Sequence, residues 1–195
     1  MQIIPAILTN DIEEFKNLLV RISDAKKFDR VQVDFVDGMF ANNKTIIPSD
    51  CNLPKYPSFK FDAHLMVTID NVVNYSQLAQ EQGFDRIFVH AESVLNQVEY
   101  EYLAIDLSAD IGSFNENFVD NKRAILLMSV KAGFSNQKFK EEVTKKINWF
   151  SFYRKEESLN FNIILDGGIE KEQLISLENL GVDEVVVGAN RVLSW

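Results

Sequence analysis

The stretch VQVDFVDGMF, residues 31–40, alternates apolar residues with Gln32 and Asp34 over its first five positions. Alternation with a period of two is typical of a β-strand, because successive side chains point to opposite faces of a sheet. Burying an ionised carboxylate costs several kcal/mol unless a cation or hydrogen-bond donors meet it. Either one face of this strand is in water, or its polar groups line a functional site.

Seven other short runs of mainly β-branched, aromatic or aliphatic residues occur along the chain, and each precedes a helical or loop stretch. Several are nearly apolar throughout, as strands covered on both faces are. Together with residues 30–36, the runs are residues 3–8, 60–67, 86–92, 102–108, 124–130, 161–167 and 183–189. Eight strands alternating with helices in 195 residues predict a closed (β/α)8 barrel, the TIM barrel, as a single domain over residues 1–195. An open doubly wound sheet is the alternative, but it seldom carries eight strands at this length.

Three connections depart from the regular pattern. The segments after the fourth and fifth strands, SVLNQVEYE (93–101) and ADIGSFNENFVDNKR (109–123), are short for full helices. The eighth helix is missing or reduced to a turn, because few residues follow the eighth strand. We expect this to leave apolar barrel surface uncovered near strands eight and one, and we predict a homo-oligomer contact there.

The composition excludes several classes of partner. The net charge of −9 argues against binding to nucleic acid or to an anionic membrane surface. The sequence has no 18-residue apolar run, and its N-terminus lacks the basic start of a signal peptide. A single cysteine, Cys51, excludes an intramolecular disulfide and a cysteine metal cluster. We therefore expect a soluble, cytoplasmic protein that acts on a small molecule.

Polar residues occur where the active site of such a barrel is built, at the C-terminal ends of the strands. Gln32 and Asp34 are on the second strand, His64 is on the third and Asp166 ends the seventh. Taken singly, a strand-end aspartate is most often a turn former, and a histidine among apolar residues is most often part of the core. Together, three oxygen or nitrogen ligands from three strands, with an amide nearby, could hold one divalent cation.

Glycine-bearing loops follow the last three strands: KAGFSNQKF (131–139), DGGIEKEQ (166–173) and GANRV (188–192). Backbone N–H groups freed by glycine, with a helix N-terminus behind them, form an anion site. The loops after strands seven and eight are the usual phosphate position in these barrels. Each glycine alone could serve only to turn the chain, but the three loops together favour a phosphorylated ligand.

Seven motifs in chain order resemble the ribulose-phosphate 3-epimerase family. They are IIPAILTNDIEEF (3–15), VQVDFVDGMF (31–40), FDAHLMV (61–67), FVHAE (88–92), LLMSVKAGFSNQKF (126–139), ILDGGI (164–169) and VVVGAN (185–190). The family is a (β/α)8 barrel that interconverts D-ribulose 5-phosphate and D-xylulose 5-phosphate, so the resemblance implies a phosphosugar substrate. The spacing between these motifs matches that of the family, except in the shortened fourth and fifth units and at the missing or reduced last helix.

The resemblance also implies roles for individual residues. Asp34 and Asp166 match two aspartates that act on opposite faces of the third carbon of the substrate, one removing a proton and the other returning one. Both match metal ligands, with His64 as a third, for one divalent ion (Zn, Fe, Mn, Co or Mg) that stabilises an enediolate intermediate. Met66 matches a methionine that packs against that intermediate. The positions matching the phosphate grip are Gly133, Phe134, Ser135, Gly168, Gly188 and Ala189.

The sequence departs from the family at several of these positions. Gln32 stands where the family has a fourth ligand, a histidine; an amide oxygen is the weaker ligand for zinc or iron and favours harder ions. Ala6 replaces a serine at the substrate end, and Val36 replaces a methionine. The phosphate loop Pro-Gly-Phe-Gly-Gly is AGFSN (132–136) here, so two glycines are lost. We expect this loss to restrict the approach of the backbone to the phosphate.

These features leave three hypotheses. The first is a working pentose-phosphate 3-epimerase. The second is a catalytically impaired barrel that binds a sugar phosphate or a protein partner, and the third is an epimerase of a ketohexose 6-phosphate. A decarboxylase of the orotidine-phosphate type would need a lysine within DAHLMV (62–67), which has none. We expect Asp37 to cap its loop and His90 and Glu92 to be structural, and we assign no partner to Asp62.

Overall fold

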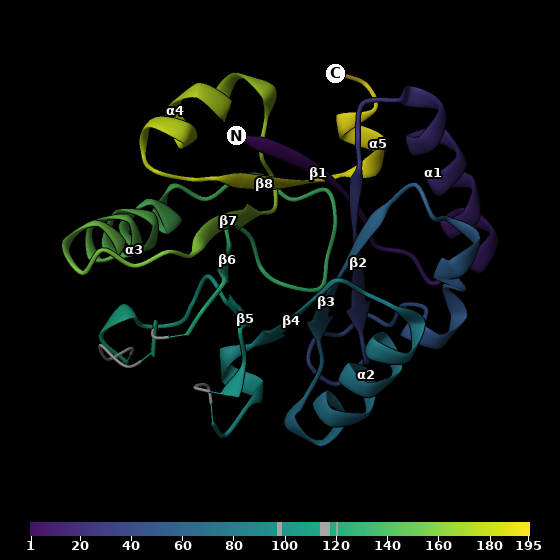
Figure 1. Cartoon of the computed structure of the whole chain (residues 1–195), viewed down its shortest axis with the longest axis horizontal. Helices are drawn as coiled ribbons and strands as arrows, with labels where there is room; N and C mark the ends of the chain where they lie inside the picture. Colours follow the sequence, from purple (N-terminus) through teal and green to yellow (C-terminus); the bar gives the residue numbers. More distant parts are fainter. Residues whose placement is uncertain (97–98, 114–117, 120) are drawn as a thin grey trace.

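The computed structural model describes residues 1–96, 99–113, 118–119 and 121–195. Eight parallel strands pair in chain order, and β8 pairs with β1, so the sheet closes into a barrel (Figure 1). The strands are β1 (Gln2–Ile7), β2 (Arg30–Val36), β3 (Lys60–Met66), β4 (Arg86–His90), β5 (Tyr102–Ile105), β6 (Ala124–Met128), β7 (Asn162–Asp166) and β8 (Glu184–Gly188). Each falls on a predicted run, and the closed barrel predicted from the sequence is confirmed.

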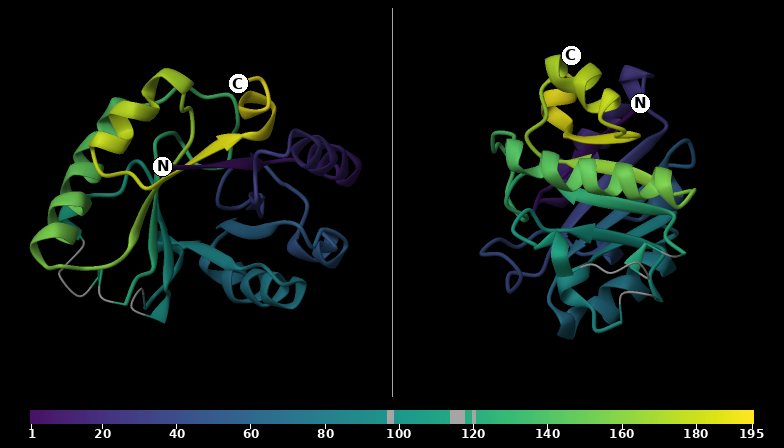
Figure 2. Two further views of the ribbon diagram at one scale, coloured as in Figure 1. Left: turned by 45° about the horizontal axis from the view of Figure 1, so that its top comes forward. Right: turned by 90° about the vertical axis from the view of Figure 1, so that its left-hand side faces the viewer.

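Among the described residues, five α-helices lie outside the strands (Figure 2). They are α1 (Ile12–Ala25), α2 (Ile69–Gln82), α3 (Thr144–Glu156), α4 (Leu174–Asn179) and α5 (Ala189–Val192). The side chain of Asp11 caps α1 by accepting a hydrogen bond from the Glu13 N–H, and Phe15 and Leu19 of the same helix are fully buried. None of the helices in the described part of the chain is long and apolar enough to cross a membrane.

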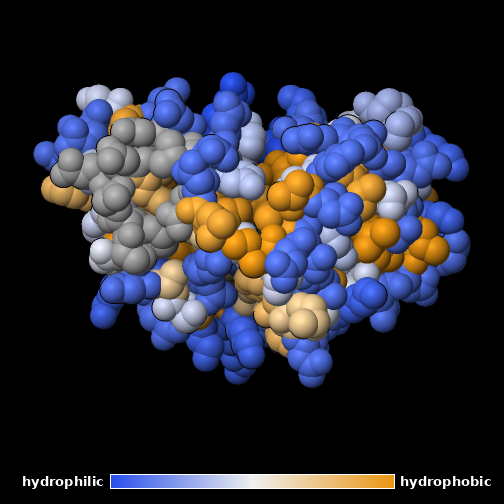
Figure 3. Space-filling view, turned by 90° about the horizontal axis from the view of Figure 1, so that it is seen from below, coloured by the Kyte–Doolittle hydropathy of each residue, from blue (hydrophilic) through white to orange (hydrophobic). Residues whose placement is uncertain are grey.

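Three connections contain 3-10 helices and no α-helix among their described residues. Residues 91–101 contain η3 (Ala91–Ser93) and residues 106–123 contain η5 (Ile111–Ser113), so the shortened fourth and fifth units are confirmed. The connection after β2 contains only η1 (Pro48–Asp50) and η2 (Leu53–Lys55), which the sequence analysis did not predict. Two further turns, η7 (Glu141–Val143) and η8 (Lys171–Gln173), lead into α3 and α4. Figure 3 shows apolar side chains in the middle of the face seen from below Figure 1, bordered by hydrophilic ones.

The last helix is short, as predicted, but the reason given for an oligomer contact near β8 and β1 is wrong. Although α5 has four residues, it packs on β8, β1 and α1, and Ala189 and Val192 are buried there. The large exposed apolar side chains of the described residues belong to other elements, such as Val20 of α1 and Val73 of α2. A homo-oligomer stays a prediction, without an uncovered β8–β1 surface to support it.

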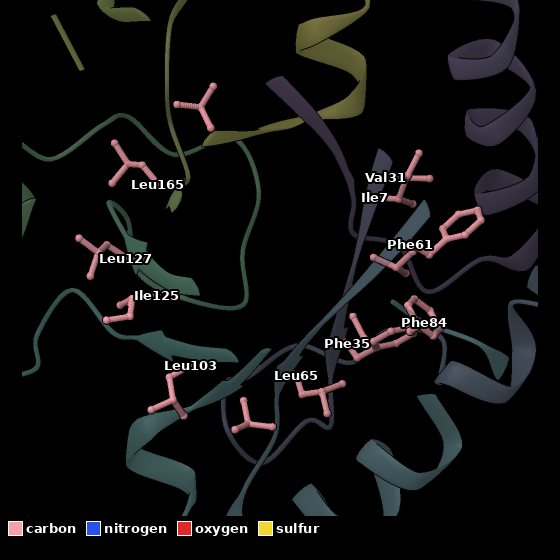
Figure 4. Close-up of a cluster of buried hydrophobic side chains, with 14 of the residues drawn as sticks. Ile7, Val31, Phe35, Phe61, Leu65, Phe84, Leu103, Ile125, Leu127 and Leu165 are labelled. Atoms are coloured by element: carbon pink, nitrogen blue, oxygen red, sulfur yellow. The ribbon is translucent and has the colours of Figure 1, made fainter. Parts of the chain in front are cut away.

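Both faces of the strands are buried, and this answers the question raised by VQVDFV. Odd-numbered residues of β2, such as Phe35, belong to the apolar layer between the strands and the surrounding helices (Figure 4). Even-numbered residues point into the barrel, where Gln32 is 1% and Asp34 is 7% exposed. The possibility that one face of this strand is in water is therefore wrong.

The N-terminal end of the barrel interior is closed by a group of charged and polar residues that we call the floor: Arg30, Asp62, Arg86, Asn162 and Glu184. The Arg86 guanidinium donates to both Asp62 oxygens, at 2.9 and 2.6 Å, and to both Glu184 oxygens, at 3.0 and 2.8 Å. Arg30 also donates to Asp62, and Asn162 donates to Glu184 at 2.7 Å. Asp62, for which the sequence suggested no partner, is thus paired with two arginines.

Candidate active site

A cavity of about 260 Å³ opens at the C-terminal ends of the strands. Every residue predicted to act in catalysis or to bind the substrate lies on its wall, from Ala6 of β1 to Ala189 at the start of α5. Gln32, predicted as a metal ligand, is not on the wall and lies one inward-facing position deeper along β2 than Asp34. The barrel therefore brings the predicted site residues together, while their roles stay predictions.

Four polar residues converge at the bottom of this cavity, and we call this group the mouth cluster: Gln32, Asp34, His64 and Asp166. His64 lies directly opposite Asp34 in the register of β2 and β3. Its Nδ1 is 3.1 Å from Asp34 Oδ1 and 3.4 Å from Asp166 Oδ2. The Gln32 amide nitrogen donates to the same two oxygens, at 2.8 Å each, and is 3.4 Å from His64 Nδ1. No lysine or arginine of the described residues pairs with Asp34 or Asp166.

Burial and proximity perturb the protonation of this cluster. Burial is the largest influence on Asp34 and raises the pKa of its carboxyl group, and the nearby Asp166 charge acts in the same direction. Burial lowers the pKa of His64, but its hydrogen bonds to Asp166 and Asp34 and their negative charge outweigh this effect and raise the pKa to about 9. Asp34 and His64 consequently hold their protons at a higher pH than the same groups would in water.

His90, expected from the sequence to be structural, contacts the ring of His64. Its Nε2 lies 3.0 Å from His64 Nε2, and the two rings stack with their centroids 5.1 Å apart. On its other side, His90 Nδ1 is 3.4 Å from Glu92 Oε2. His90 is fully buried, so this contact fixes the orientation of the His64 ring. The FVHAE motif signalled these residues, but their contact with His64 depends on the pairing of β3 with β4.

Asp37 caps the loop after β2, as expected. Its carboxylate accepts hydrogen bonds from the N–H groups of Met39 and Phe40, both at 2.8 Å. The other oxygen accepts from the Thr68 N–H at 2.8 Å and from Asn71 at 2.9 Å, which joins this loop to the start of α2. Burial opposes the charge, but these donors outweigh it and lower the pKa of Asp37 to about 2.

The loops predicted to bind phosphate meet at one side of the cavity. Gly168 has a φ of +65°, and a Cβ there would lie 2.4 Å from the backbone nitrogen of Phe139 in the loop after β6. Only glycine permits that approach. Asn136, which stands where the resemblance implies a glycine, has a left-handed conformation with a φ of 59°. Asparagine adopts this conformation more readily than most residues, so its backbone geometry needs no glycine.

Arg191 lies on the same side of the cavity and was not singled out in the sequence. Its Nη1 donates to Glu170 Oε1 at 2.9 Å and to the carbonyl oxygen of Ile169 at 3.2 Å. It thereby joins the loop after β8 to the loop after β7, and it also lines the cavity. The signal available in the sequence was its place in GANRV, three residues after Gly188.

The donors of the mouth cluster fit a divalent cation. Asp34, His64 and Asp166 are buried and each offers a ligand atom, and these atoms lie within 4.8 Å of one another. Two carboxylates and an imidazole are a common ligand set for first-row divalent metals. Gln32 presents its nitrogen to this group, whereas a metal ligand would have to present the amide oxygen.

Comparison with known proteins gives consistent matches. The model of the ribulose-phosphate 3 epimerase family matches residues 2–192. The chain is 27% identical to ribulose-phosphate 3-epimerase of Helicobacter pylori strain J99, over 97% of this chain and 89% of the relative. It is 31% identical to ribulose-phosphate 3-epimerase of Aquifex aeolicus, over 83% of this chain and 76% of the relative.

Among solved structures, 3-keto-L-gulonate-6-phosphate decarboxylase from Vibrio cholerae is similar, with a TM-score of 0.63. The match covers 96% of this chain and 87% of the decarboxylase chain, at 17% sequence identity. At that identity the likeness shows the barrel fold alone.

Proposed function

This chain belongs to the ribulose-phosphate 3-epimerase family, and we propose that it interconverts D-ribulose 5-phosphate and D-xylulose 5-phosphate. The observation that carries the proposal is the pair Asp34 and Asp166, whose carboxylate oxygens lie within 4.8 Å of each other on the wall of one cavity. The two residues come from β2 and β7, which are not neighbours in the barrel. A substrate carbon between them would have an acidic group on each side.

Epimerisation needs such a pair. The ionised carboxylate takes the proton from the third carbon, and the electrons of that C–H bond pass toward the neighbouring carbonyl, which gives an enediolate with a planar third carbon. The other carboxyl group, in its acid form, donates a proton to the opposite face. A single base would tend to return the proton to the face it left. Positioned proton transfer of this kind contributes about 10²–10⁴-fold to the rate.

The raised pKa of Asp34 supports a division of roles. The pKa of Asp34 is raised, with burial as the main cause, so Asp34 retains a proton more readily than an exposed aspartate. Asp34 then acts as the acid in one direction of the reaction while Asp166 acts as the base. In the reverse direction the two exchange roles.

We further propose that Asp34, His64 and Asp166 hold one divalent cation, drawn from Zn, Fe, Mn, Co and Mg. A bound cation would supply Lewis-acid stabilisation of the negative charge that develops on the substrate oxygens. Met66, buried in the cavity wall, would pack against the substrate. His90 would keep the His64 ring in one orientation through its 3.0 Å contact.

The substrate phosphate is proposed to bind at the glycine loops on one side of the cavity. Gly168 and Gly188 bring the backbone close to this space, and the loop of Gly133, Phe134 and Ser135 faces it. The guanidinium of Arg191 adds a positive charge on the same side. In this proposal the phosphate lies at one end of the cavity and the third carbon lies between the two aspartates at the other.

The proposal is tested by incubating the purified protein, supplied with Mn²⁺ or Zn²⁺, with ribulose 5-phosphate in D₂O. NMR should detect deuterium at the third carbon together with xylulose 5-phosphate. Unphosphorylated ribulose should react much more slowly, because it lacks the group held by the glycine loops. Deuterium incorporation into a ketohexose 6-phosphate alone would assign the activity to that substrate. A folded protein that exchanges no proton at this carbon would contradict the proposal.

A further inference from the structure

The Gln32 side chain lies at the centre of the mouth cluster. Its nitrogen is 2.8 Å from Asp34 Oδ1 and 2.8 Å from Asp166 Oδ2, and the residue is only 1% exposed. A primary amide nitrogen carries two hydrogens, so one can be donated to each carboxylate. When both carboxylates are ionised they offer only acceptors, so the amide nitrogen and not the amide oxygen faces them. The partners of the amide therefore fix which of its ends faces them.

The position of this nitrogen coincides with the place that a cation would need. The three atoms that could bind a cation belong to Asp34, His64 and Asp166, and the Gln32 nitrogen lies within 3.4 Å of each of them. A cation held by the same atoms would have to approach both carboxylates at least as closely as the nitrogen does. The amide and a cation cannot both occupy this position.

We propose that Gln32 is a positioning residue whose amide N–H groups hold Asp34 and Asp166 together without a cation and compete with a cation for them. The inference deepens the proposed function, because these carboxylates are its proton-transfer pair. Two ionised carboxylates at this separation repel each other. Donation of one hydrogen to each offsets part of that repulsion and keeps both groups facing the same space. A cation enters only when these two charge-assisted hydrogen bonds break.

The opposite reading is that Gln32 is a cation ligand, with its amide turned so that the oxygen faces the metal. The two readings predict opposite effects of removing the amide. If Gln32 competes with the cation, its removal strengthens cation binding. If Gln32 is a ligand, its removal weakens cation binding. The sign of the change separates them.

The test uses Gln32→Met, which keeps a side chain of similar length but has no N–H donor. Its thioether sulfur is a poor ligand for Mn²⁺, so the substitution adds no new ligand for the probe. Both proteins are stripped with a chelator, and Mn²⁺ binding is measured by isothermal titration calorimetry. We expect the dissociation constant of the variant to fall by about tenfold, which corresponds to about 1.4 kcal/mol for the lost competition. An unchanged or larger dissociation constant would overturn the proposal.

Thermal unfolding gives a second readout. Without Mn²⁺, the midpoint of the variant should fall by about 5 °C, because Asp34 and Asp166 lose their shared donor. Saturating Mn²⁺ should remove most of that difference, while the midpoint of the parent protein should respond much less. A loss of stability that is equal with and without Mn²⁺ would mean that Gln32 has only a packing role, and would contradict the proposal.

Thr45→Val is the matched control. Thr45 is buried beside β2, where its hydroxyl accepts from the Val36 N–H and donates to the Ile46 carbonyl, both at 2.9 Å. This variant should lose stability to the same extent in either condition and bind Mn²⁺ with unchanged affinity. Gln32→Ala replaces Gln32→Met if the latter does not fold. None of these measurements uses a sugar substrate, so their failure would leave the proposed reaction standing, and a failed exchange assay would leave this result intact.

Discussion

At the floor of the barrel, Asp62 and Glu184 are buried against Arg86, whereas in the mouth cluster Asp34 and Asp166 are buried against Gln32 and His64. The two groups share the same barrel interior. Apolar side chains from the strands between them, including Phe88 and Leu126, are fully buried. The two sets of carboxylates thus meet different partners, although Asp62 and His64 are successive inward-facing residues of β3.

The difference lies in how the negative charge is neutralised. At the floor, Arg86 donates four hydrogen bonds to the two carboxylates, and the two carboxylates outweigh burial and raise its pKa further above its usual value. An arginine keeps its proton at any pH at which the protein is folded. In the mouth cluster the partners are an amide and an imidazole, which can yield their places to a proton, a cation or a substrate. The floor carboxylates are thus paired with a permanent charge, whereas those of the mouth cluster are not.

The largest expected effect on stability comes from removing the arginine at the centre of the floor. Arg86→Met should lower the free energy of unfolding by about 3–5 kcal/mol, because it leaves Asp62 and Glu184 buried with too few partners. Denaturant unfolding measures this. Arg123→Met is the control for the same chemical change at the surface, where Arg123 pairs with Glu101 and both are mostly exposed; it should cost under about 1 kcal/mol. Equal effects of the two substitutions would show that the floor contributes nothing special.

A smaller expected effect is the pH dependence of stability, which should differ between the mouth cluster and the floor. The pKa of His64 is about 9 in the folded protein and about 6.5 in the unfolded chain. Its contribution to stability is therefore fully present below pH 6.5 and is lost as the pH rises through 9, by on the order of 3 kcal/mol. Arg30 and Arg86 at the floor keep their charge over the same range.

The measurement is denaturant unfolding of the chelator-stripped protein at several pH values from 6 to 9. His64→Gln removes the titrating group and should flatten the decline in stability across this window. The comparison uses the slopes, because the substitution also changes stability at every pH. The same slope in both proteins would show that another group titrates in the mouth cluster.

The smallest effect concerns the rim of the cavity. Gly83 and Gly168 both have positive φ, but a Cβ on Gly83 would meet nothing within 4 Å, whereas one on Gly168 would lie 2.4 Å from the Phe139 backbone nitrogen. Gly83→Ala should cost about 1 kcal/mol from backbone strain alone. Gly168→Ala should cost about 1 kcal/mol more and should weaken the binding of inorganic phosphate, measured by calorimetry. Equal costs would mean that the loop after β6 moves aside freely.

The barrel could be predicted from the sequence because each strand is a local apolar run. The positions of Asp34, His64 and Asp166 could also be predicted, because the strand ends of a (β/α)8 barrel all face one cavity. The partner of Asp62 could not, because Asp62 and Arg86 become neighbours only through the register of β3 with β4. In the sequence, a charged residue within an apolar strand does not reveal which end of the barrel it will occupy.

Two further features also required the structure. Gln32 follows the alternation of its strand, but the sequence does not say whether its nitrogen or its oxygen faces the carboxylates. That orientation depends on Asp166, which is 134 residues away. The absence of an α-helix among the residues after β2 was signalled only weakly, by Pro48 and Pro54 in a polar segment. Proline disfavours a helix interior, but it is also common in a first turn.

The most direct test of the contrast between the two ends is the matched pair Asp166→Asn and Asp62→Asn, each measured for deuterium exchange at the third carbon of ribulose 5-phosphate and for its free energy of unfolding. Asp166→Asn should lower the exchange rate by about 10²–10⁴-fold and change stability by no more than about 1 kcal/mol. Asp62→Asn should keep the exchange rate of the folded protein and lose about 3–5 kcal/mol of stability. Retained exchange in Asp166→Asn, or lost exchange in a folded Asp62→Asn, would contradict the account.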